Sequence, residues 1–218
     1  DVYEKEKKQS ELYKQYLMLQ INPHFFLNAL NTIYMLNKRK DNNQVNILLT
    51  YLINYFKSVF ARQGEMVPLK EEINFMLNYM AIQKFRFAGA MHLQCEIEPE
   101  AEISMVPAMC VLTFVENAIK YNVDGGWVKV ILDADHQYFT VGVSDSGIGI
   151  PQESIEHIYE RFYRVDKSHS REIGGTGLGL AITRSAILMH RGSVNVTSEE
   201  GVGTTFTVKI PLSYIAPV

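Results

Sequence analysis

The segment Val115-Glu116-Asn117-Ala118-Ile119-Lys120-Tyr121 closes a mostly apolar stretch, residues 107–121, that is predicted to form a helix. Its polar side chains recur three and four residues apart, so they form one stripe along the helix. The stripe comprises Thr113, Glu116, Asn117, Lys120 and Tyr121. An asparagine carbonyl is a suitable Mg²⁺ ligand, and a lysine one turn later can contact phosphate oxygens. The segment therefore indicates either a solvated helix face or a site for a phosphate-bearing ligand.

A second polar segment, Asp145-Ser146-Gly147-Ile148-Gly149, follows alternating apolar residues at 139–143 that predict a strand. Because strand side chains alternate, Asp145 shares the face of those apolar residues, where an acid is costly unless a partner pairs with it. The exocyclic amine of adenine is a suitable donor to that acid, and the two glycines would let the backbone turn tightly beneath the base. The alternative is an ordinary Asp-Ser-Gly turn.

The third segment is Gly174-Gly175-Thr176-Gly177-Leu178-Gly179-Leu180, which begins a predicted helix at 178–190. Backbone N–H groups at a helix N-terminus, made accessible by glycines, form an anion site. The G-x-G-x-G spacing differs from the dinucleotide fingerprint G-x-G-x-x-G, and no βαβ unit follows it. The preceding residues 164–173 are polar and rich in Ser, Lys and Arg, so we expect a mobile lid there. A further glycine turn, Gly201-Val202-Gly203-Thr204-Thr205, precedes the last predicted strand.

The N-terminal region has the pattern of a helical hairpin. Apolar residues recur at alternating steps of four and three between residues 12 and 33, and a second helical pattern runs from Val45 to Val59. Pro23 falls inside the first pattern and should kink the helix just before His24. Dimerised, the hairpin would form a four-helix bundle, and a monomeric hairpin packed on the next domain is the alternative. His24 is largely unprotonated and nucleophilic near pH 7, so it is the candidate reacting group.

The remainder of the chain predicts an α+β fold. Pro68 and the acids after it begin a third helix that extends to about Phe87. Alternating apolar residues then predict strands at 93–97, 128–132, 139–143, 194–196 and 206–210, interleaved with the two helices above. This order predicts an α/β sandwich, a sheet covered by helices on one face. We expect three parts: a dimerising hairpin at 1–62, a connecting helix at 63–87 and a ligand-binding domain at 88–218.

Composition narrows the function further. The net charge of −3 and the lack of a long basic run give no reason to expect nucleic-acid binding. Cys95 and Cys110 match no metal-ligand spacing and indicate reduced, cytosolic thiols. No apolar stretch approaches the roughly 18 residues of a membrane span, and the sequence has no signal peptide. Because the chain opens with charged residues already in helical register, we expect it to be part of a longer protein.

Together these segments resemble a bacterial two-component sensor histidine kinase over nearly the whole chain. Residues 20–28 read Q-I-N-P-H-F-F-L-N, similar to the hallmark Q-I-N-P-H-F-x-x-N of the LytS-like subfamily. The segments around Asn117, Asp145 and Gly177 are similar to the N, G1 and G2 boxes of the Bergerat (GHKL) fold, the ATP-binding domain shared with gyrase B, Hsp90 and MutL. Residues 160–182 instead resemble the common kinase class, which carries H-E-L-R-T-P around its histidine, with the F box at 160–164. The chain is therefore predicted to be a mosaic of a LytS-like phosphoacceptor region and a common-type lid.

The resemblance implies ATP-dependent autophosphorylation of His24, within the hairpin, and transfer to an aspartate of a response regulator receiver domain. It implies ATP and Mg²⁺ as cofactors, a homodimer, and a cytoplasmic position below a membrane anchor contributed by absent upstream segments. Asn28 resembles the residue that positions water for dephosphorylating the regulator, so phosphatase activity is also expected. The implied nucleotide-binding residues are Asn117, Lys120, Tyr121, Asp145, Gly147, Ile148, Gly149, Phe162, Arg164, Gly175, Thr176, Gly177, Leu178, Gly179 and Thr205, with Asn117 also the Mg²⁺ ligand.

The catalytic partner of His24 stays open at this point. The common class has an acid directly after its histidine, where this chain has Phe25, so Glu116 and an acid from a partner subunit are the alternatives. Two other functions compete with the kinase. One is a nucleotide-gated dimeric switch that binds ATP without phosphorylating itself. The other is a hydrolytic ATPase of the MutL and Hsp90 branch, but those enzymes have a water-activating glutamate where this chain has Thr113.

Overall fold

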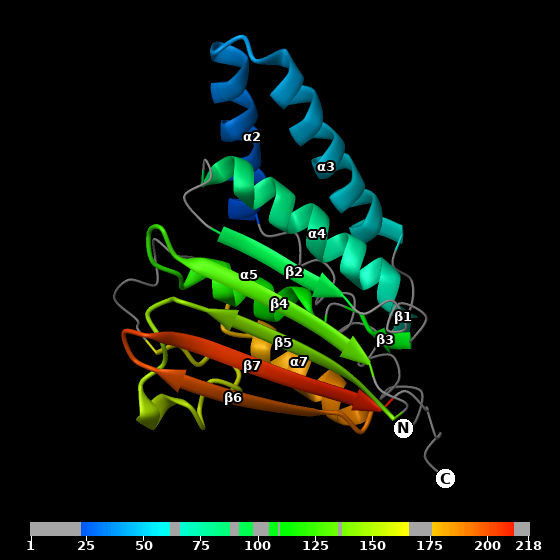
Figure 1. Ribbon diagram of the computed structural model, residues 1–218, viewed down its shortest axis with the longest axis vertical. Helices are drawn as coiled ribbons and strands as arrows, with labels where there is room; N and C mark the ends of the chain where they lie inside the picture. The colour runs from blue at the N-terminus through cyan, green and yellow to red at the C-terminus, as the bar shows by residue number, and fades with distance from the viewer. Residues whose placement is uncertain are drawn as a thin grey trace, which may run out of the picture.

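The computed structural model describes residues 23–61, 66–87, 92–97, 105–108, 110–134, 137–165 and 176–211. At one end of the molecule, α2 (Pro23–Lys38) and α3 (Asn42–Ala61) form a helical hairpin (Figure 1). The backbone N–H of Gln44 donates to the carboxylate of Asp41 (3.1 Å), which caps α3. The kink expected at Pro23 and the helical pattern before it fall on or beside residues 1–22, which lie outside the described residues.

A third helix, α4 (Leu69–Arg86), follows a short strand, β1 (Met66–Pro68). The helix agrees within one residue at each end with the one predicted at 68–87. Strand β1 pairs antiparallel with β3 (Met105–Pro107), a two-stranded ladder that the sequence pattern did not indicate. Three residues are too few to establish an alternation of apolar and polar side chains, so this pairing could not be read locally.

Five strands form one mixed sheet, in the order β2-β4-β5-β7-β6. Strand β2 (His92–Ile97) runs parallel to β4 (Trp127–Ala134), whereas every other neighbouring pair is antiparallel. The remaining strands are β5 (Tyr138–Asp145), β6 (Ser193–Glu199) and β7 (Gly203–Pro211). All five strands predicted for this sheet are confirmed, and so is the α+β class.

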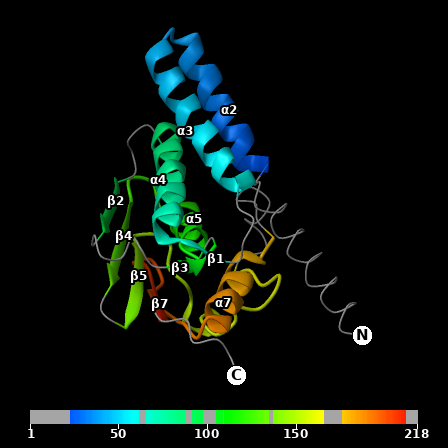
Figure 2. The same ribbon diagram turned by 90° about the vertical axis from the view of Figure 1, so that its right-hand side faces the viewer.

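Two helices cover one face of the sheet, α5 (Leu112–Lys120) and α7 (Gly179–Met189), and α4 lies on the same side (Figure 2). Helix α5 begins five residues later than the predicted start at 107, because Met105–Pro107 is extended and pairs with β1. A short 3₁₀ helix, η2 (Gln152–Ser154), follows β5. The covered face carries the sheet's buried side chains, such as Val141 and Val208.

A cluster of aromatic rings connects the hairpin to α4. The Phe25 ring, from α2, lies 5.1 Å from the Tyr79 ring and 4.9 Å from the Tyr55 ring, measured between ring centroids. Tyr55 in turn stacks on Phe75 at 4.8 Å. These buried rings belong to a continuous hydrophobic core that extends from the hairpin to the sheet. The division of the chain at residues 62 and 87 stays a prediction.

Candidate functional site

The polar stripe predicted on residues 107–121 runs along α5, from Thr113 in its first turn to Tyr121 just after its end. The side-chain amide nitrogen of Asn117 donates to the backbone carbonyl of Thr113 (2.7 Å), which directs the amide oxygen Oδ1 toward other partners. The helix ends at Lys120 and is followed by the C-cap residue Tyr121, whose backbone N–H donates to the Asn117 carbonyl (3.0 Å). One helix end therefore presents an amide oxygen and, one turn on, the ammonium group of Lys120.

Glu116 and Lys120 share a partly buried environment that changes the pKa of each. Burial raises the pKa of Glu116 from 4.5 to about 7, and the neighbouring Lys120 opposes the rise. Burial lowers the pKa of Lys120 to about 8, the positive charge of Arg164 lowers it further, and Glu116 opposes both. Burial and Arg164 thus disfavour the positive charge on Lys120. A bound phosphate group would favour that charge, because a nearby anion stabilises the protonated amine.

Asp145, the last residue of β5, is buried on the helix-covered face as predicted. Its carboxylate accepts a hydrogen bond from the backbone N–H of Gly147 (2.8 Å) and one from the backbone of Thr204. Burial raises the pKa of Asp145, and these two hydrogen bonds oppose the rise. Two backbone donors hold the carboxyl group in place, and no described residue forms an ion pair with it, which suits a neutral donor such as an exocyclic amine.

The G1 segment runs close beneath the end of α5. The backbone N–H of Ile148 donates to the carbonyl of Tyr121 (3.0 Å), and a side chain at Gly147 would overlap that same carbonyl. The carbonyl of Ile148 accepts from the backbone N–H of Gly201 (2.8 Å). Gly147 is therefore required by a close approach of two backbones, and this contact brings Asp145 and Tyr121 to one site.

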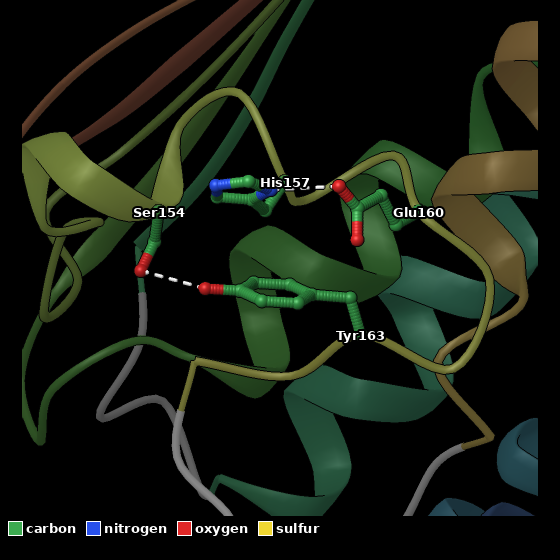
Figure 3. A network of polar contacts seen from close by, with 4 residues as sticks. All are labelled: Ser154, His157, Glu160 and Tyr163. Atoms are coloured by element: carbon green, nitrogen blue, oxygen red, sulfur yellow. Dashed lines mark hydrogen bonds and ion pairs between the residues drawn. The ribbon is translucent and has the colours of Figure 1, made fainter.

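The F-box segment is fixed by a local network of polar contacts (Figure 3). The Tyr163 hydroxyl donates to the Ser154 hydroxyl (3.0 Å), and Nδ1 of His157 lies 2.7 Å from Oε1 of Glu160. The His157 and Tyr163 rings pack against each other at 5.6 Å. The contact with Glu160 raises the pKa of His157. The network shapes the loop that carries Phe162 and Arg164.

Phe162 and Gly177 meet where the loop approaches the start of α7. The backbone N–H of Phe162 donates to the Gly177 carbonyl (3.0 Å), and both residues have positive φ, 66° and 71°. A Cβ atom at Gly177 would lie 2.8 Å from the Phe162 backbone, so glycine is needed there. The Phe162 side chain is 70% exposed. Leu178 precedes α7, and its N–H donates to the Thr176 hydroxyl (3.3 Å).

Gly175 and most of the expected lid lie outside the described residues, because only Arg164 and Val165 of that segment are described. Gly149 is described and has a positive φ of 69°. Gly179 begins α7. As far as the structure describes them, the segment that follows Asp145 lies against the C-terminal end of α5, and the glycine segment at the start of α7 lies beside Thr113, in the first turn of α5.

Thr205 does not face the site. It pairs with Ser144 across β5 and β7, and its hydroxyl donates to the Ser144 hydroxyl (3.0 Å) on the face opposite to the helices. Thr204 is the residue that pairs with Asp145 and is buried beside it. The residue predicted from the sequence was Thr205, whereas the alternation that places Phe206 inside assigns Thr204 to the same buried face.

His24 and Asn28 lie on the first two turns of α2. The backbone of His24 is helical, and its side chain lies outside what the structure describes. Asn28 is partly buried, one turn further along. The ring of Phe25, which replaces the acid of the common class, is 6% exposed and packs into the aromatic cluster. Phe25 therefore has a packing role.

Comparison with known proteins agrees with this arrangement. The family model of histidine kinase-, DNA gyrase B- and HSP90-like ATPases matches residues 106–214, and that of histidine kinases matches residues 12–91. The sensor histidine kinase RppB of Synechocystis sp. is 46% identical over 102 residues, 47% of this chain and 22% of RppB. WalK of Bacillus subtilis is 43% identical over 99 residues, 44% of this chain and 16% of WalK.

Among solved structures, the mycobacterial sensor histidine kinase MprB superimposes with a TM-score of 0.55 at 26% identity, covering 69% of this chain and all of that one. The chain spans about a fifth of the length of the curated relatives it matches. It belongs to the family of histidine kinase-, gyrase B- and Hsp90-like ATPases, and its two matched regions are those of a sensor histidine kinase. The LytS-like assignment of the N-terminal region stays a prediction.

Proposed function

We propose that this chain is an ATP:protein-histidine phosphotransferase that transfers the terminal phosphate of ATP to His24. The observation that carries the proposal is the backbone contact that brings Asp145, at the end of β5, next to the end of α5, which bears Asn117 and Lys120. The site then has a group suited to an adenine base at one end, Asp145, and groups suited to phosphates at the other, Asn117 and Lys120. The family match supports ATP as the nucleotide.

Each of these residues has a separate role in binding the nucleotide. The buried carboxylate of Asp145 accepts a hydrogen bond from the adenine amine, while Gly147 lets the backbone pass beneath the base. Lys120 contacts the phosphates, and their negative charge raises its pKa above the value of about 8 that burial imposes. Arg164 adds a second positive charge at the same end of the site.

The site also fits a magnesium ion. Because the Asn117 amide nitrogen is bonded to the Thr113 carbonyl, the amide oxygen is the atom directed outward, and Mg²⁺ prefers such neutral oxygen ligands together with phosphate oxygens and water. Among the described residues, no group of three His, Cys, Asp or Glu side chains could hold a metal ion. When bound, Mg²⁺ would neutralise charge on the phosphate groups.

The chemical step is an in-line displacement. A ring nitrogen of His24 forms a bond to the γ-phosphorus, the bond from that phosphorus to the β–γ bridging oxygen breaks, and ADP leaves with the electron pair. Positive charge develops on the imidazole, and an acid near its second nitrogen would stabilise it or accept its proton. Glu116, whose pKa of about 7 lets it take up or release a proton near neutral pH, is one candidate. An acid from a partner subunit is the other.

The phosphoryl group would then pass to an aspartate of a response regulator, in keeping with the sensor kinases that the chain resembles. Asn28, one turn after His24, is the candidate for positioning water if the protein also dephosphorylates that regulator. The position below a membrane anchor stays an expectation from the same resemblance. No helix that the structure describes has the length and apolar character needed to cross a bilayer.

A homodimer through the hairpin is supported by an exposed apolar groove on α2 and α3. Phe26 and Ile53 line it together with Phe60, and these three side chains are 38%, 53% and 69% exposed. Contiguous apolar surface of this kind is typical of an interface between proteins. A second hairpin packed on this groove would complete a four-helix bundle.

The test is phosphate transfer from γ-labelled ATP, with Mg²⁺, to the wild-type chain, to His24→Gln and to His92→Gln. His92 is an exposed histidine on the edge strand β2 and serves as the matched control. We expect acid-labile, alkali-stable label on the wild type and on His92→Gln, and none on His24→Gln. Label on all three would place the acceptor elsewhere. Nucleotide binding without any label would favour the gated-switch alternative.

A further inference from the structure

Glu72, in the first turn of α4, is a fully buried acid. Its Oε1 accepts hydrogen bonds from the backbone N–H of Val111 (3.1 Å) and of Leu112 (3.4 Å), at the start of α5. A buried carboxylate is costly unless hydrogen-bond donors surround it. Its burial here therefore depends on the backbone donors at the start of α5. An acid in the first turn of a helix normally complements that helix's own dipole, whereas this one serves a second helix.

The N-cap residue of helix α5 does not cap it with its side chain. Val111 occupies the N-cap position in a helical conformation and makes no side-chain capping bond. The first N–H groups of a helix have no partner within it, and the usual solution is a Ser, Thr, Asp or Asn side chain immediately before the helix. Here the oxygen comes from 39 residues earlier in the chain. The start of α5 is thus defined by α4.

We propose that Glu72 is a positioning residue for the nucleotide site, which it acts on through α5. This inference rests on the proposed function. Six residues, about 9 Å of helix, separate Val111 from Asn117. A shift of α5 along its axis would therefore move Asn117 and Lys120 relative to Asp145, which belongs to the sheet. Glu72 fixes the distance between the phosphate end and the base end of the site.

A strand pairing and an electrostatic effect also connect α4 with α5. The strands that precede α4 and α5, β1 and β3, pair with each other, so both helices begin from one small ladder. Further along, burial raises the pKa of Tyr79 on α4, and the negative charge of Glu116 on α5 raises it further. Tyr79 is also the residue on which Phe25 stacks.

The test compares Mg·ATP with adenosine, because adenosine uses the Asp145 end of the site but not the phosphate end. Affinities are measured by calorimetry for Mg·ATP and by NMR titration for adenosine, at a temperature where circular dichroism shows each variant to be folded. For Glu72→Ala we expect Mg·ATP affinity to fall at least about tenfold and adenosine affinity to change less than about threefold. Glu72→Gln keeps an oxygen acceptor and should stay within about threefold of wild type for both ligands.

Glu71→Ala is the matched control, since Glu71 is the neighbouring acid in the same helix turn and is exposed. It should leave both affinities within about twofold of wild type. If Glu72→Ala does not fold, Glu72→Asp replaces it, and its shorter side chain should lower the ratio of Mg·ATP to adenosine affinity at least about threefold.

An unchanged ratio in folded Glu72→Ala or Glu72→Asp would overturn the inference and leave the proposed function standing. Equal weakening of both ligands would also overturn it, because it would indicate a general structural role. A wild-type chain that binds no Mg·ATP would overturn the proposed function and this inference with it.

Discussion

The hydroxyl of Thr183, in α7, donates a hydrogen bond of 2.9 Å to the hydroxyl of Thr113, in α5. This bond joins the two helices that cover the sheet. Thr113 stands at the position where the hydrolytic ATPases of the MutL and Hsp90 branch have a water-activating glutamate. The methyl group of Thr113 also lies 3.3 Å from the place where a Cβ atom of Gly179 would be. Thr113 therefore holds α5 against α7, and the position serves packing in this chain.

Replacing only one of these threonines should destabilise the fold more than replacing both. Thr113→Val leaves the buried Thr183 hydroxyl without its acceptor and should lower the free energy of unfolding by about 1–3 kcal/mol. In the double variant Thr113→Val/Thr183→Val most of that loss should be recovered, because both polar groups are gone. Urea denaturation of wild type, the two single variants and the double variant gives the interaction free energy between the two threonines. Additive losses would contradict the prediction.

Asp145→Asn should weaken ATP binding about 10- to 150-fold, the loss of a hydrogen bond to a charged group. The matched control is Ser144→Ala, on the same strand but on the face away from the helices. It should leave the affinity within about twofold of wild type. Calorimetry on both variants measures this difference. Equal effects of the two substitutions would contradict the assignment of the site to the covered face.

The same reasoning predicts different effects on ATP affinity for substitutions of two neighbouring threonines on β7, Thr204 and Thr205. Thr204→Val removes the hydroxyl that lies 2.8 Å from the Ser198 hydroxyl beside Asp145, whereas Thr205→Val changes only the far face. We expect Thr204→Val to lower ATP affinity at least about threefold more than Thr205→Val does. A larger loss of ATP affinity with Thr205→Val would support Thr205, the residue predicted from the sequence, as the nucleotide-binding threonine.

The stability of the fold should depend on the ionisation of Glu116. Its pKa is raised from 4.5 to about 7 by burial, so the folded state binds more protons than the unfolded state between these values. Stability from this group is present below pH 4.5 and is lost as pH rises to 7, on the order of 3 kcal/mol at most. Lys120, with its pKa lowered to about 8, changes stability only between pH 8 and 10.5.

Chemical denaturation at a series of pH values from 5 to 8 tests this dependence. Wild type should lose more stability over that interval than Glu116→Gln, which cannot ionise. Parallel curves for the two proteins would show that the pKa of Glu116 is close to its ordinary value.

The proposed dimer predicts a specific effect of Ile53→Asp. A charge placed in the apolar groove would be buried in the dimer without a partner, so the dissociation constant should rise at least about a hundredfold. Asn54→Asp introduces the same charge one residue away, at an exposed position outside the groove lining, and should leave the dimer intact. Sedimentation equilibrium measures both. A monomeric wild type, or two variants that dimerise equally, would remove the support for this interface.

Two glycines with the same backbone conformation should respond differently to alanine. Gly177 and Gly201 have φ values of 71° and 78°, but an added Cβ meets the Phe162 backbone at 2.8 Å in the first and nothing within 4 Å in the second. Gly201→Ala should therefore cost only the conformational term, about 1–2 kcal/mol of stability. Gly177→Ala must also displace Phe162 and the start of α7. We therefore expect it to reduce the rate of autophosphorylation much more than Gly201→Ala does. Equal rates in the two variants, measured with labelled ATP, would contradict this expectation.

The features that the sequence predicted correctly are those with a local pattern. Alternating apolar residues along Phe139, Val141 and Val143 located β5, and the same alternation put Asp145 on the buried face. The spacing of Asn117 and Lys120 on one helix needed only the helical repeat. Family motifs added the identity of the nucleotide.

The features that the sequence did not predict depend on pairs of residues far apart in the chain. Nothing near Val111 indicates that Glu72 caps it, because the two meet only after α4 and α5 have packed. The pairing of Met66 with Pro107 is equally remote. Thr204 is a different case, since its place on the covered face follows from the alternation of buried and exposed side chains along β7.

The ladder between β1 and β3 has a practical consequence for anyone who wishes to prepare the ATP-binding part alone. A fragment that begins at residue 88 would leave the backbone of Met105–Pro107 without its partner strand and the start of α5 without its acid. Such a fragment would be expected to aggregate or to bind nucleotide poorly, and the result could be mistaken for lack of function. The shortest fragment worth expressing therefore begins before Met66.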